Sequence, residues 1–243
     1  MSNIESKNDP YAQMAKNTVD SKNQLKESQS VKFDNLDGGG VRIMLVGNSI
    51  TLHGVNKKIG WHGEWGMAAS AKEKDYVHRL ESAVLKEHPD AEFCICRVAS
   101  GERLYKDGAE SIYHIFEPAR AFCADIIVIR FIENCPRAEF DSEILQESLD
   151  KLIKHLDGAG GARVIVTGGF WRHPGDAALR EYADKNGHPF VYLSDLGEDD
   201  AMKAIGLFEH SCVANHPGDL GTQVIADRIA EKLLPLINDI KNA

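Results

Sequence analysis

The chain has 243 residues, of which 43% are hydrophobic and 27% are charged, and its formal net charge is -9. This composition is typical of a soluble domain with a full hydrophobic core, although the length alone also allows two domains. The acidic balance argues against a nucleic acid or an anionic membrane as the partner. No apolar run is long enough to cross a membrane, and the first residues lack the features of a signal peptide. We therefore expect a cytoplasmic protein, or a secreted one if the N-terminus was trimmed.

Hydrophobic runs divide the chain into a polar arm, residues 1–35, and one α/β domain, residues 36–243. The arm is rich in Asn, Lys, Ser and Gln and is expected to be flexible. Val/Ile-rich runs predict strands at 41–46, 92–98, 125–132, 162–168 and 190–194. Apolar residues at helical spacing predict helices at 75–86, 139–156, 176–186 and 219–237. This alternation favours a three-layer α/β/α sandwich around a mostly parallel sheet of about five strands.

Four short blocks stand where the predicted strands end or where the last helix begins. Residues 47–51 (Gly-Asn-Ser-Ile-Thr) follow the first strand, residues 99–101 (Ala-Ser-Gly) the second, and residues 132–134 (Ile-Glu-Asn) the third. The fourth block is a His-Pro pair at 216–217, before the terminal helix. Open α/β sheets place their active sites at the carboxyl ends of the strands. The Ser of the first block and the His of the fourth are therefore candidates for a nucleophile and its base.

Together these blocks resemble the motifs of the SGNH (GDSL-like) hydrolase superfamily, from about residue 41 to about residue 237. The resemblance implies a flavodoxin-like fold and an ester hydrolase that works through an acyl-enzyme. It implies Ser49 as the nucleophile and His216 as the base. The expected oxyanion donors are the backbone N–H groups of Ser49 and Gly101 and the side-chain amide of Asn134.

The blocks also depart from the family pattern. Asn48 stands where the family has Asp, Ile132 where it has Gly, and Cys135 where it has a second Asp. Val213 stands three residues before His216, where the family usually has the acid of the triad. The group that fixes the tautomer of the His is therefore missing from its usual place.

Three groups could support His216 instead of that acid. Glu133 follows the third strand and should face the same edge of the sheet, and it is the alternative that we favour. A backbone carbonyl could accept the imidazole N–H and leave a Ser–His dyad. Asp219 is the third alternative, although its place in the first turn of a helix is more typical of an N-cap.

A second His-Pro-Gly-Asp tetrapeptide begins at His173, after the fourth predicted strand, and makes this residue a rival for the role of base. We prefer His216, because the family order places the base before the terminal helix. Trp171, Arg172 and His173 are then expected to contact the substrate. Alternatively, they cap the sheet, with Arg172 paired to an acid.

The long connection after the first block, residues 52–70, carries Trp61 and Trp65. Long loops in compact domains tend to be functional, so we expect a wall or lid beside Ser49 that contacts the substrate. The alternative is a structural loop whose Trp residues plug one end of the sheet. Asn48, in the nucleophile block, is a further candidate for substrate binding.

The main hypothesis is a serine ester hydrolase that acts on a small-molecule or glycan ester, above all on an acetyl group carried by a carbohydrate. Trp side chains could stack on sugar faces, and no long apolar lid is visible for a fatty acyl chain. The alternatives are a lysophospholipase, thioesterase or acyltransferase of the same family, a decayed α/β binding module, or a flavodoxin-like nucleotide binder. No cofactor is expected, and no metal, because His53 and His62 match no zinc spacing. The oligomeric state stays open.

Overall fold

A six-stranded sheet lies at the centre of the computed structural model, which describes residues 30–241. Its strands stand in the order β1-β3-β2-β4-β5-β6, and all neighbours are parallel except β1, which runs antiparallel to β3. The strands are β1 Val31–Asp34, β2 Arg42–Gly47, β3 Glu92–Arg97, β4 Ile126–Arg130, β5 Arg163–Thr167 and β6 Phe190–Val191. The predicted three-layer α/β/α architecture with a mostly parallel sheet is confirmed.

The sheet has one strand more than expected. Strand β1 lies in the segment that the sequence predicted as the end of a polar arm, and it forms an edge of the sheet against β3. The rest of that predicted arm, residues 1–29, lies outside the described residues.

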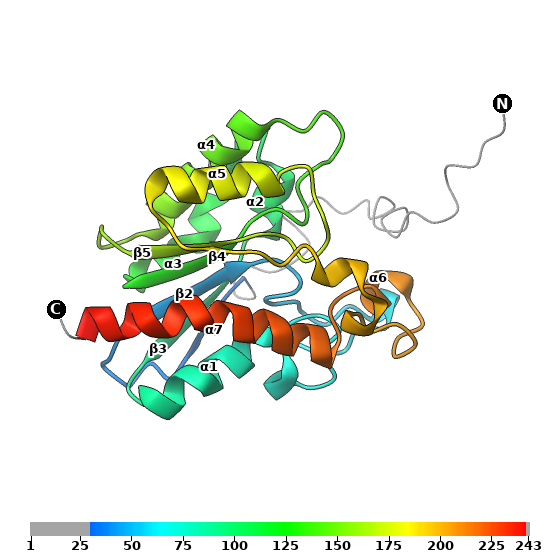
Figure 1. Cartoon of the computed structure of the whole chain (residues 1–243), viewed down its shortest axis with the longest axis horizontal. Helices are drawn as coiled ribbons and strands as arrows, with labels where there is room; N and C mark the ends of the chain where they lie inside the picture. Colours follow the sequence, from blue (N-terminus) through cyan, green and yellow to red (C-terminus); the bar gives the residue numbers. More distant parts are fainter. Residues whose placement is uncertain (1–29, 242–243) are drawn as a thin grey trace.

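Helices cover both faces of the sheet. Figure 1 shows α1 and α7 on one face and α2, α3, α4 and α5 on the other. The α-helices are α1 Tyr76–Glu87, α2 Ala99–Arg103, α3 Glu117–Ala121, α4 Ser142–Leu156, α5 Asp176–Asn186, α6 Ser211–Ala214 and α7 Asp219–Lys241. Five 3₁₀ helices among the described residues are η4 Lys57–Ile59, η5 Lys72–Lys74, η6 Ala109–Phe116, η7 Leu196–Glu198 and η8 Asp200–Met202.

The four predicted helices are present; α5 has the predicted bounds, and each of the other three differs at one end or both. Helix α4 begins at Ser142 rather than 139, because the side chain of Asp141 accepts hydrogen bonds from the backbone N–H groups of Glu143 and Ile144. Helix α7 continues to Lys241, past Pro235. No helix of the described residues is long and apolar enough to cross a membrane.

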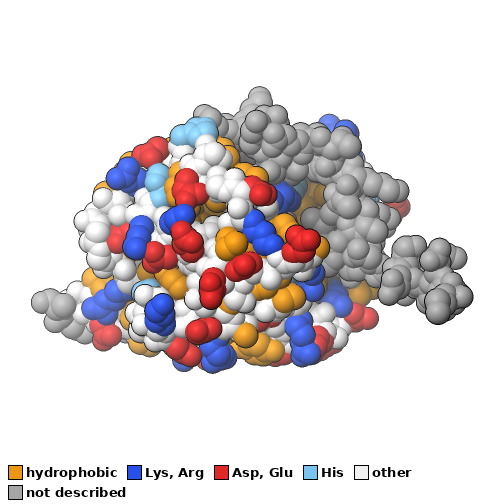
Figure 2. All heavy atoms as spheres, turned by 90° about the horizontal axis from the view of Figure 1, so that it is seen from above, with side chains coloured by type: hydrophobic (Ala, Val, Ile, Leu, Met, Phe, Trp, Pro, Cys, Tyr) orange, Lys and Arg blue, Asp and Glu red, His pale blue; other side chains and the backbone are white. Residues whose placement is uncertain are grey.

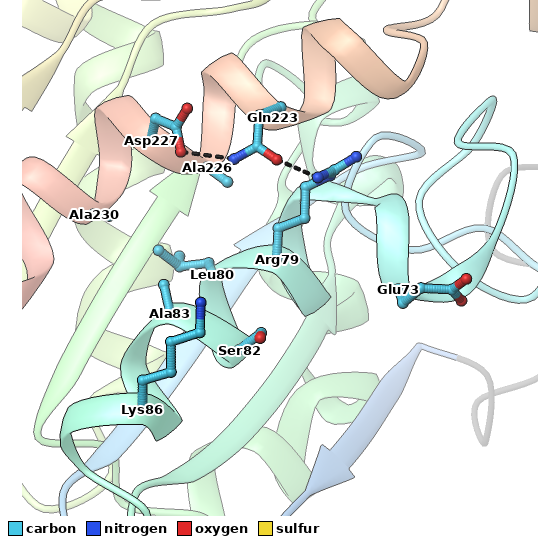
Figure 3. Close-up of a pocket in the computed structure, with 10 residues that line it drawn as sticks. All are labelled: Glu73, Arg79, Leu80, Ser82, Ala83, Lys86, Gln223, Ala226, Asp227 and Ala230. Atoms are coloured by element: carbon cyan, nitrogen blue, oxygen red, sulfur yellow. Dashed lines mark hydrogen bonds between the residues drawn. The ribbon is translucent and has the colours of Figure 1, made fainter.

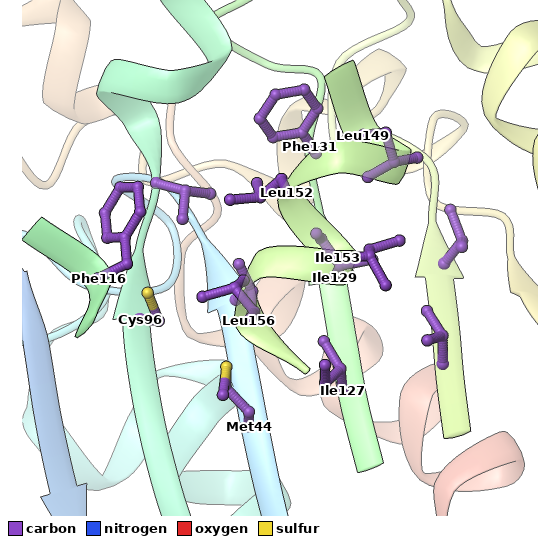
Figure 4. Close-up of a cluster of buried hydrophobic side chains, with 14 of the residues drawn as sticks. Met44, Cys96, Phe116, Ile127, Ile129, Phe131, Leu149, Leu152, Ile153 and Leu156 are labelled. Carbon is purple, nitrogen blue, oxygen red and sulfur yellow. The ribbon is translucent and has the colours of Figure 1, made fainter. Parts of the chain in front are cut away.

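Side chains of the central strands alternate between two hydrophobic cores, as the period of a strand requires. Met44 and Val46 of β2 point towards α4 and α5, whereas Ile43 and Leu45 point towards α1 and α7. The first of these cores is drawn in Figure 4, where side chains of α4 lie over those of the central strands. All four of these β2 side chains are 0% exposed. Burying one such side chain is worth about 1.5–3 kcal/mol, so the interior of β2 is rigidly placed.

The direction in which successive strands are added to the sheet reverses at β2. It pairs with β3 on one side and with β4 on the other, so the chain moves outward from β2 both ways. In doubly wound sheets such a switch point opens a crevice at the carboxyl end of the strand. The residue that follows this end of β2 by two positions is Ser49.

Candidate active site

The turn after β2 is built to present Ser49. A Cβ at Gly47 would lie 2.0 Å from Thr51 Oγ1, so only glycine fits at the end of the strand. The carbonyl of Asn48 accepts hydrogen bonds from the N–H groups of Thr51 and Leu52, at 3.0 and 2.9 Å. The carbonyl of Ser49 is also held, by the N–H of Met67 at 2.8 Å. The nucleophile candidate thus sits on a turn with little freedom to move.

His216 lies opposite Ser49 and has a defined tautomer. Its Nε2 is 2.8 Å from Ser49 Oγ, and its Nδ1 is 2.6 Å from the backbone carbonyl oxygen of Cys212. A carbonyl can only accept, so Nδ1 carries the hydrogen and Nε2 has a free lone pair for the Ser49 hydroxyl. Cys212 belongs to α6, whose single turn places this carbonyl under the imidazole.

The prediction that Glu133 accepts the His216 N–H is therefore wrong. The carboxylate of Glu133 instead accepts from the Asn48 amide at 2.6 Å, the Phe170 N–H at 3.1 Å and the guanidinium of Arg130. Of the three alternatives, the backbone carbonyl is the one observed.

The carboxylate of Asp219, the other alternative, also accepts hydrogen bonds from groups other than His216. These donors are the N–H and hydroxyl of Ser70 and the side chain of Lys74, at 2.7–3.0 Å. Asp219 thus fastens the end of the loop after Ser49 to the first turn of α7, and it has no part in orienting the imidazole.

Burial sets the charge of His216. The residue is 3% exposed, and this desolvation lowers its pKa to about 4, against the opposing effects of the Cys212 carbonyl and the Glu133 charge. The imidazole is neutral at pH 7, as a general base must be. Glu133 therefore acts on His216 through space, without a direct hydrogen bond.

The oxyanion candidates occupy two further elements at the same edge. Gly101 lies in the first turn of α2, where backbone N–H groups have no intrahelical acceptor. A Cβ there would be 3.7 Å from the Phe131 ring, so the protein itself leaves room for a side chain. Asn134 follows β4, and its Nδ2 donates to Glu102 Oε2 at 2.5 Å while Arg103 donates to its Oδ1 at 3.3 Å. These two bonds fix which way the amide nitrogen points.

A buried polar network lies beneath the Ser49 turn. The Asn48 amide donates to both Glu102 and Glu133, at 3.0 and 2.6 Å. Asn48 is 0% exposed, so the prediction that it binds substrate is wrong. Burial and the nearby Glu133 charge raise the pKa of Glu102. Glu133 pairs with Arg130, and the network ties the first, second and third blocks together.

The aromatic candidates divide into buried and partly exposed. Trp61 is 2% exposed and packs against Trp65 and Phe208 at ring distances of 5.6 and 5.9 Å. The structural alternative for this loop therefore holds for Trp61, which is not available to a sugar. Trp171, by contrast, is partly exposed and meets the His216 ring edge to face at 5.1 Å.

The other two candidates after β5 have structural partners. Arg172 is exposed and forms an ion pair with Glu198 at 2.9 Å, which is the alternative stated for it. His173 is 4% exposed, its Nε2 donates to the Cys135 carbonyl at 3.1 Å and its Nδ1 accepts from the Gly175 N–H at 3.0 Å. Both ring nitrogens are used, so its assignment as a substrate residue or rival base is wrong.

Several groups near the candidate site were not predicted from sequence. Arg97, at the end of β3, is 6% exposed, and its Nε has no hydrogen-bond partner among the described residues. Burial and then the Arg97 charge lower the pKa of His53 to about 3, with smaller effects from His216 and Arg103. Glu102 was missed too, although it directly follows the second block.

A pocket of about 310 Å³ lies elsewhere, between α1 and α7. Figure 3 shows it at the hydrogen-bonded row formed by Arg79, Gln223 and Asp227. None of its lining residues belongs to the Ser49 site. Over the described surface seen in Figure 2, acidic and basic side chains are interspersed rather than gathered by sign.

No family model and no curated protein sequence matches this chain. Solved structures do. The psychrotrophic esterase EstA from Pseudoalteromonas sp. is 13% identical with a TM-score of 0.52, and the match covers 81% of this chain and 98% of that one. A two-domain esterase active on acetylated mannans is 17% identical with a TM-score of 0.51, over 88% of this chain and 58% of that one.

A family two carbohydrate esterase from Cellvibrio japonicus is 13% identical with a TM-score of 0.52, over 82% of this chain and 62% of that one. The chain has the SGNH hydrolase fold. It spans less than two thirds of the two carbohydrate-active proteins, and at these identities the likeness concerns the fold.

Proposed function

We propose that this protein is a serine ester hydrolase with Ser49 as nucleophile and His216 as base. The observation that carries the proposal is the contact of Ser49 Oγ with His216 Nε2 at 2.8 Å, in a tautomer fixed by the Cys212 carbonyl. A neutral imidazole that accepts from a serine hydroxyl is the arrangement that activates this weak nucleophile.

The reaction follows from the positions of these groups. His216 Nε2 takes the hydroxyl proton as Ser49 Oγ attacks the ester carbonyl, and it then delivers that proton to the leaving alcohol. The imidazolium formed in between keeps its Nδ1–H on the Cys212 carbonyl. Water, deprotonated by the same imidazole, then cleaves the acyl-enzyme.

The negative charge of the tetrahedral intermediate needs donors that are already in place. We assign this role to the backbone N–H groups of Ser49 and Gly101 and to the Asn134 amide. Asn134 is supported by its hydrogen bonds to Glu102 and Arg103, which leave one amide hydrogen to point elsewhere. A donor held in this way needs no reorganisation during the reaction.

Acetyl esters of carbohydrate-like molecules are the proposed substrates. Solved structures with this fold include a family two carbohydrate esterase and an esterase active on acetylated mannans, which supports this substrate class. A putative GDSL-like lipase is also among them, so lipid esters are the competing class. We assign contact with the leaving alcohol to Trp171, because this side chain is partly exposed and its ring lies against that of His216.

Hydrolysis of p-nitrophenyl acetate, butyrate and octanoate tests the proposal. We expect acetate to be cleaved best, and Ser49→Ala and His216→Ala each to lose at least about a thousandfold in kcat. Ser82→Ala and His62→Ala, at exposed positions, are the matched controls and should match wild type. A fluorophosphonate probe should label wild type and not Ser49→Ala. Absence of labelling, with no hydrolysis of any ester, would favour the decayed binding module instead.

A further inference from the structure

A cluster of three side chains lies away from the Ser49 site, between the edge strand β1 and helix α1. It consists of Asp34, His78 and Glu81, each of which offers one ligand atom, and these atoms all lie within 4.8 Å of one another. His78 Nε2 is 3.7 Å from Asp34 Oδ2. His78 and Glu81 are one helical turn apart and so face the same way.

A hydrogen bond at Nδ1, on the side of the imidazole away from the cluster, fixes the orientation of His78. Asp75, the N-cap of α1, is fully buried and accepts from the His78 N–H at 2.8 Å and from His78 Nδ1 at 2.7 Å. A carboxylate can only accept, so Nδ1 carries the hydrogen and Nε2 presents a lone pair towards Asp34 and Glu81. A carboxylate behind a histidine in this way is typical of metal-binding histidines.

Two of the ligand atoms of this cluster have no hydrogen-bond partner among the described residues. His78 Nε2 and Glu81 Oε1 are buried and accept no hydrogen bond among the described residues. Glu81 is 6% exposed, and its surroundings explain why its ionised form is disfavoured. Burial and the charges of Asp34 and Asp75 raise its pKa to about 8, against the opposing charge of Lys72. Three acceptor groups converge here, and the buried one, Glu81, requires a proton or a cation beside it.

We propose that Asp34, His78 and Glu81 bind a divalent transition-metal ion, with zinc as the best match. One imidazole nitrogen and two carboxylate oxygens form a three-ligand set that zinc completes with a water molecule. Zinc ligands lie ~2.0–2.2 Å from the metal and hence roughly 3.3–3.6 Å from one another, close to the His78–Asp34 spacing. Magnesium prefers oxygen ligands in an octahedron, so it should bind worse.

The site would join elements that the sequence keeps far apart. Asp34 belongs to β1 at the edge of the sheet, and the other two ligands belong to α1, so the metal would fasten the edge strand to the helix. A metal bound only to the folded state raises Tm. Lys72, 3.9 Å from Asp34 and more than half exposed, is a competing cation that can move away into solvent.

Titration of the metal-free full chain with ZnCl₂ in a calorimeter tests the site. We expect one zinc equivalent that is lost or weakened at least about tenfold in Asp34→Asn, His78→Gln and Glu81→Gln. Glu87→Gln, exposed on the same helix, is the matched control and should bind as wild type does. Thermal melts without metal establish that each variant is folded. At about a hundred times its Kd, zinc should raise the Tm of wild type by roughly 5–10 °C, whereas an equal concentration of MgCl₂ should not.

Cobalt substitution identifies the ligands. Co²⁺ in the site should give visible d–d absorption without the intense near-ultraviolet band of a thiolate ligand, and Glu81→Gln should remove it. Ser49→Ala should bind zinc as wild type does, so the outcome is independent of the proposed hydrolase activity. Zinc binding that is equal in wild type and in all three ligand variants, or a thiolate band, would overturn the proposal. So would the absence of binding at millimolar ZnCl₂.

Discussion

Restoring the acid that the family pattern expects should harm this protein. Val213 stands where the SGNH motif usually has the triad Asp, but His216 Nδ1 already donates to the Cys212 carbonyl at 2.6 Å. Val213 is 0% exposed and packs in the small apolar cluster formed by Trp61, Met67, Ala68 and Ala204. Val213→Asp would therefore place a carboxyl group among apolar side chains and would leave the hydrogen bond of His216 with its present acceptor.

The size of the effect follows from burial. Removing the valine side chain from the cluster loses about 1.5–3 kcal/mol of hydrophobic stabilisation. Keeping a fully buried Asp neutral at pH 7 requires a pKa shift of about 3 units or more, at ~1.4 kcal/mol each. The total exceeds about 5 kcal/mol, which is comparable to the whole stability of many domains. For a chain of this length, it corresponds to a fall in Tm of at least about 10 °C.

Thermal melts and p-nitrophenyl acetate kinetics of wild type, Val213→Asp and Val213→Leu provide the assay. We expect Val213→Asp to melt at least about 10 °C lower or to be insoluble, and Val213→Leu to lose no more than ~3 kcal/mol. Where Val213→Asp folds, its kcat/KM should not exceed that of wild type. A Val213→Asp protein with unchanged Tm and a tenfold higher kcat/KM would refute the view that the carbonyl is sufficient.

Four further outcomes follow from the geometry. Burial lowers the pKa of His216 to about 4, and only the neutral imidazole accepts a proton. The value of kcat/KM should therefore stay constant down to about pH 5 and fall tenfold per pH unit below pH 4. A midpoint near pH 6.5 in the pH profile would contradict this. Asn134→Ala should lower kcat by 10²- to 10³-fold (about 3–4 kcal/mol) with little change in KM, whereas a pure KM effect would remove Asn134 from the oxyanion hole. Asn48→Asp should lower Tm because it adds a third carboxylate beside Glu102 and Glu133, and the double variant with Glu102→Gln should recover part of that loss in a melt. Trp61→Ala should lose about 3–5 kcal/mol of unfolding free energy in denaturant titration, and a loss under 1 kcal/mol would show that the side chain is not part of a core.

The fold could be predicted from the sequence where strands are buried on both faces. The interior of β2 is continuously apolar, and so are the interiors of β3 and β4, because helices cover the sheet on both sides. Strand β1 could not be predicted in this way. Val31 is buried, whereas the other three residues (Lys-Phe-Asp) are partly or largely exposed at the edge of the sheet, and the strand continues a polar segment. A short edge strand leaves no signal stronger than its surroundings.

The candidate site could likewise be predicted only in part. Ser49 and His216 could be predicted because each stands at a fixed place on its own element, and the order of the elements brings them together. The acceptor for His216 Nδ1 could not be predicted from the sequence. It is a main-chain oxygen, that of Cys212, and any residue type supplies one. The side-chain candidates Glu133 and Asp219 were plausible by position alone, but each is held by other donors that sequence does not reveal.

The departures from the family pattern depend on one another. The amide of Asn48 donates to Glu102 and to Glu133, which an Asp at this position could not do, so two buried carboxyl groups below the turn require Asn there. Glu102 in turn holds the amide of Asn134, and the Glu133 charge favours the imidazolium that His216 would become in the proposed reaction. Glu133 is thus an acid close to His216, but it is hydrogen-bonded to Asn48 beneath the Ser49 turn and acts on the imidazole only through its charge. A chain that lacks the triad Asp need not have lost its site, because a buried charge and a backbone acceptor can share the tasks that one carboxylate performs elsewhere.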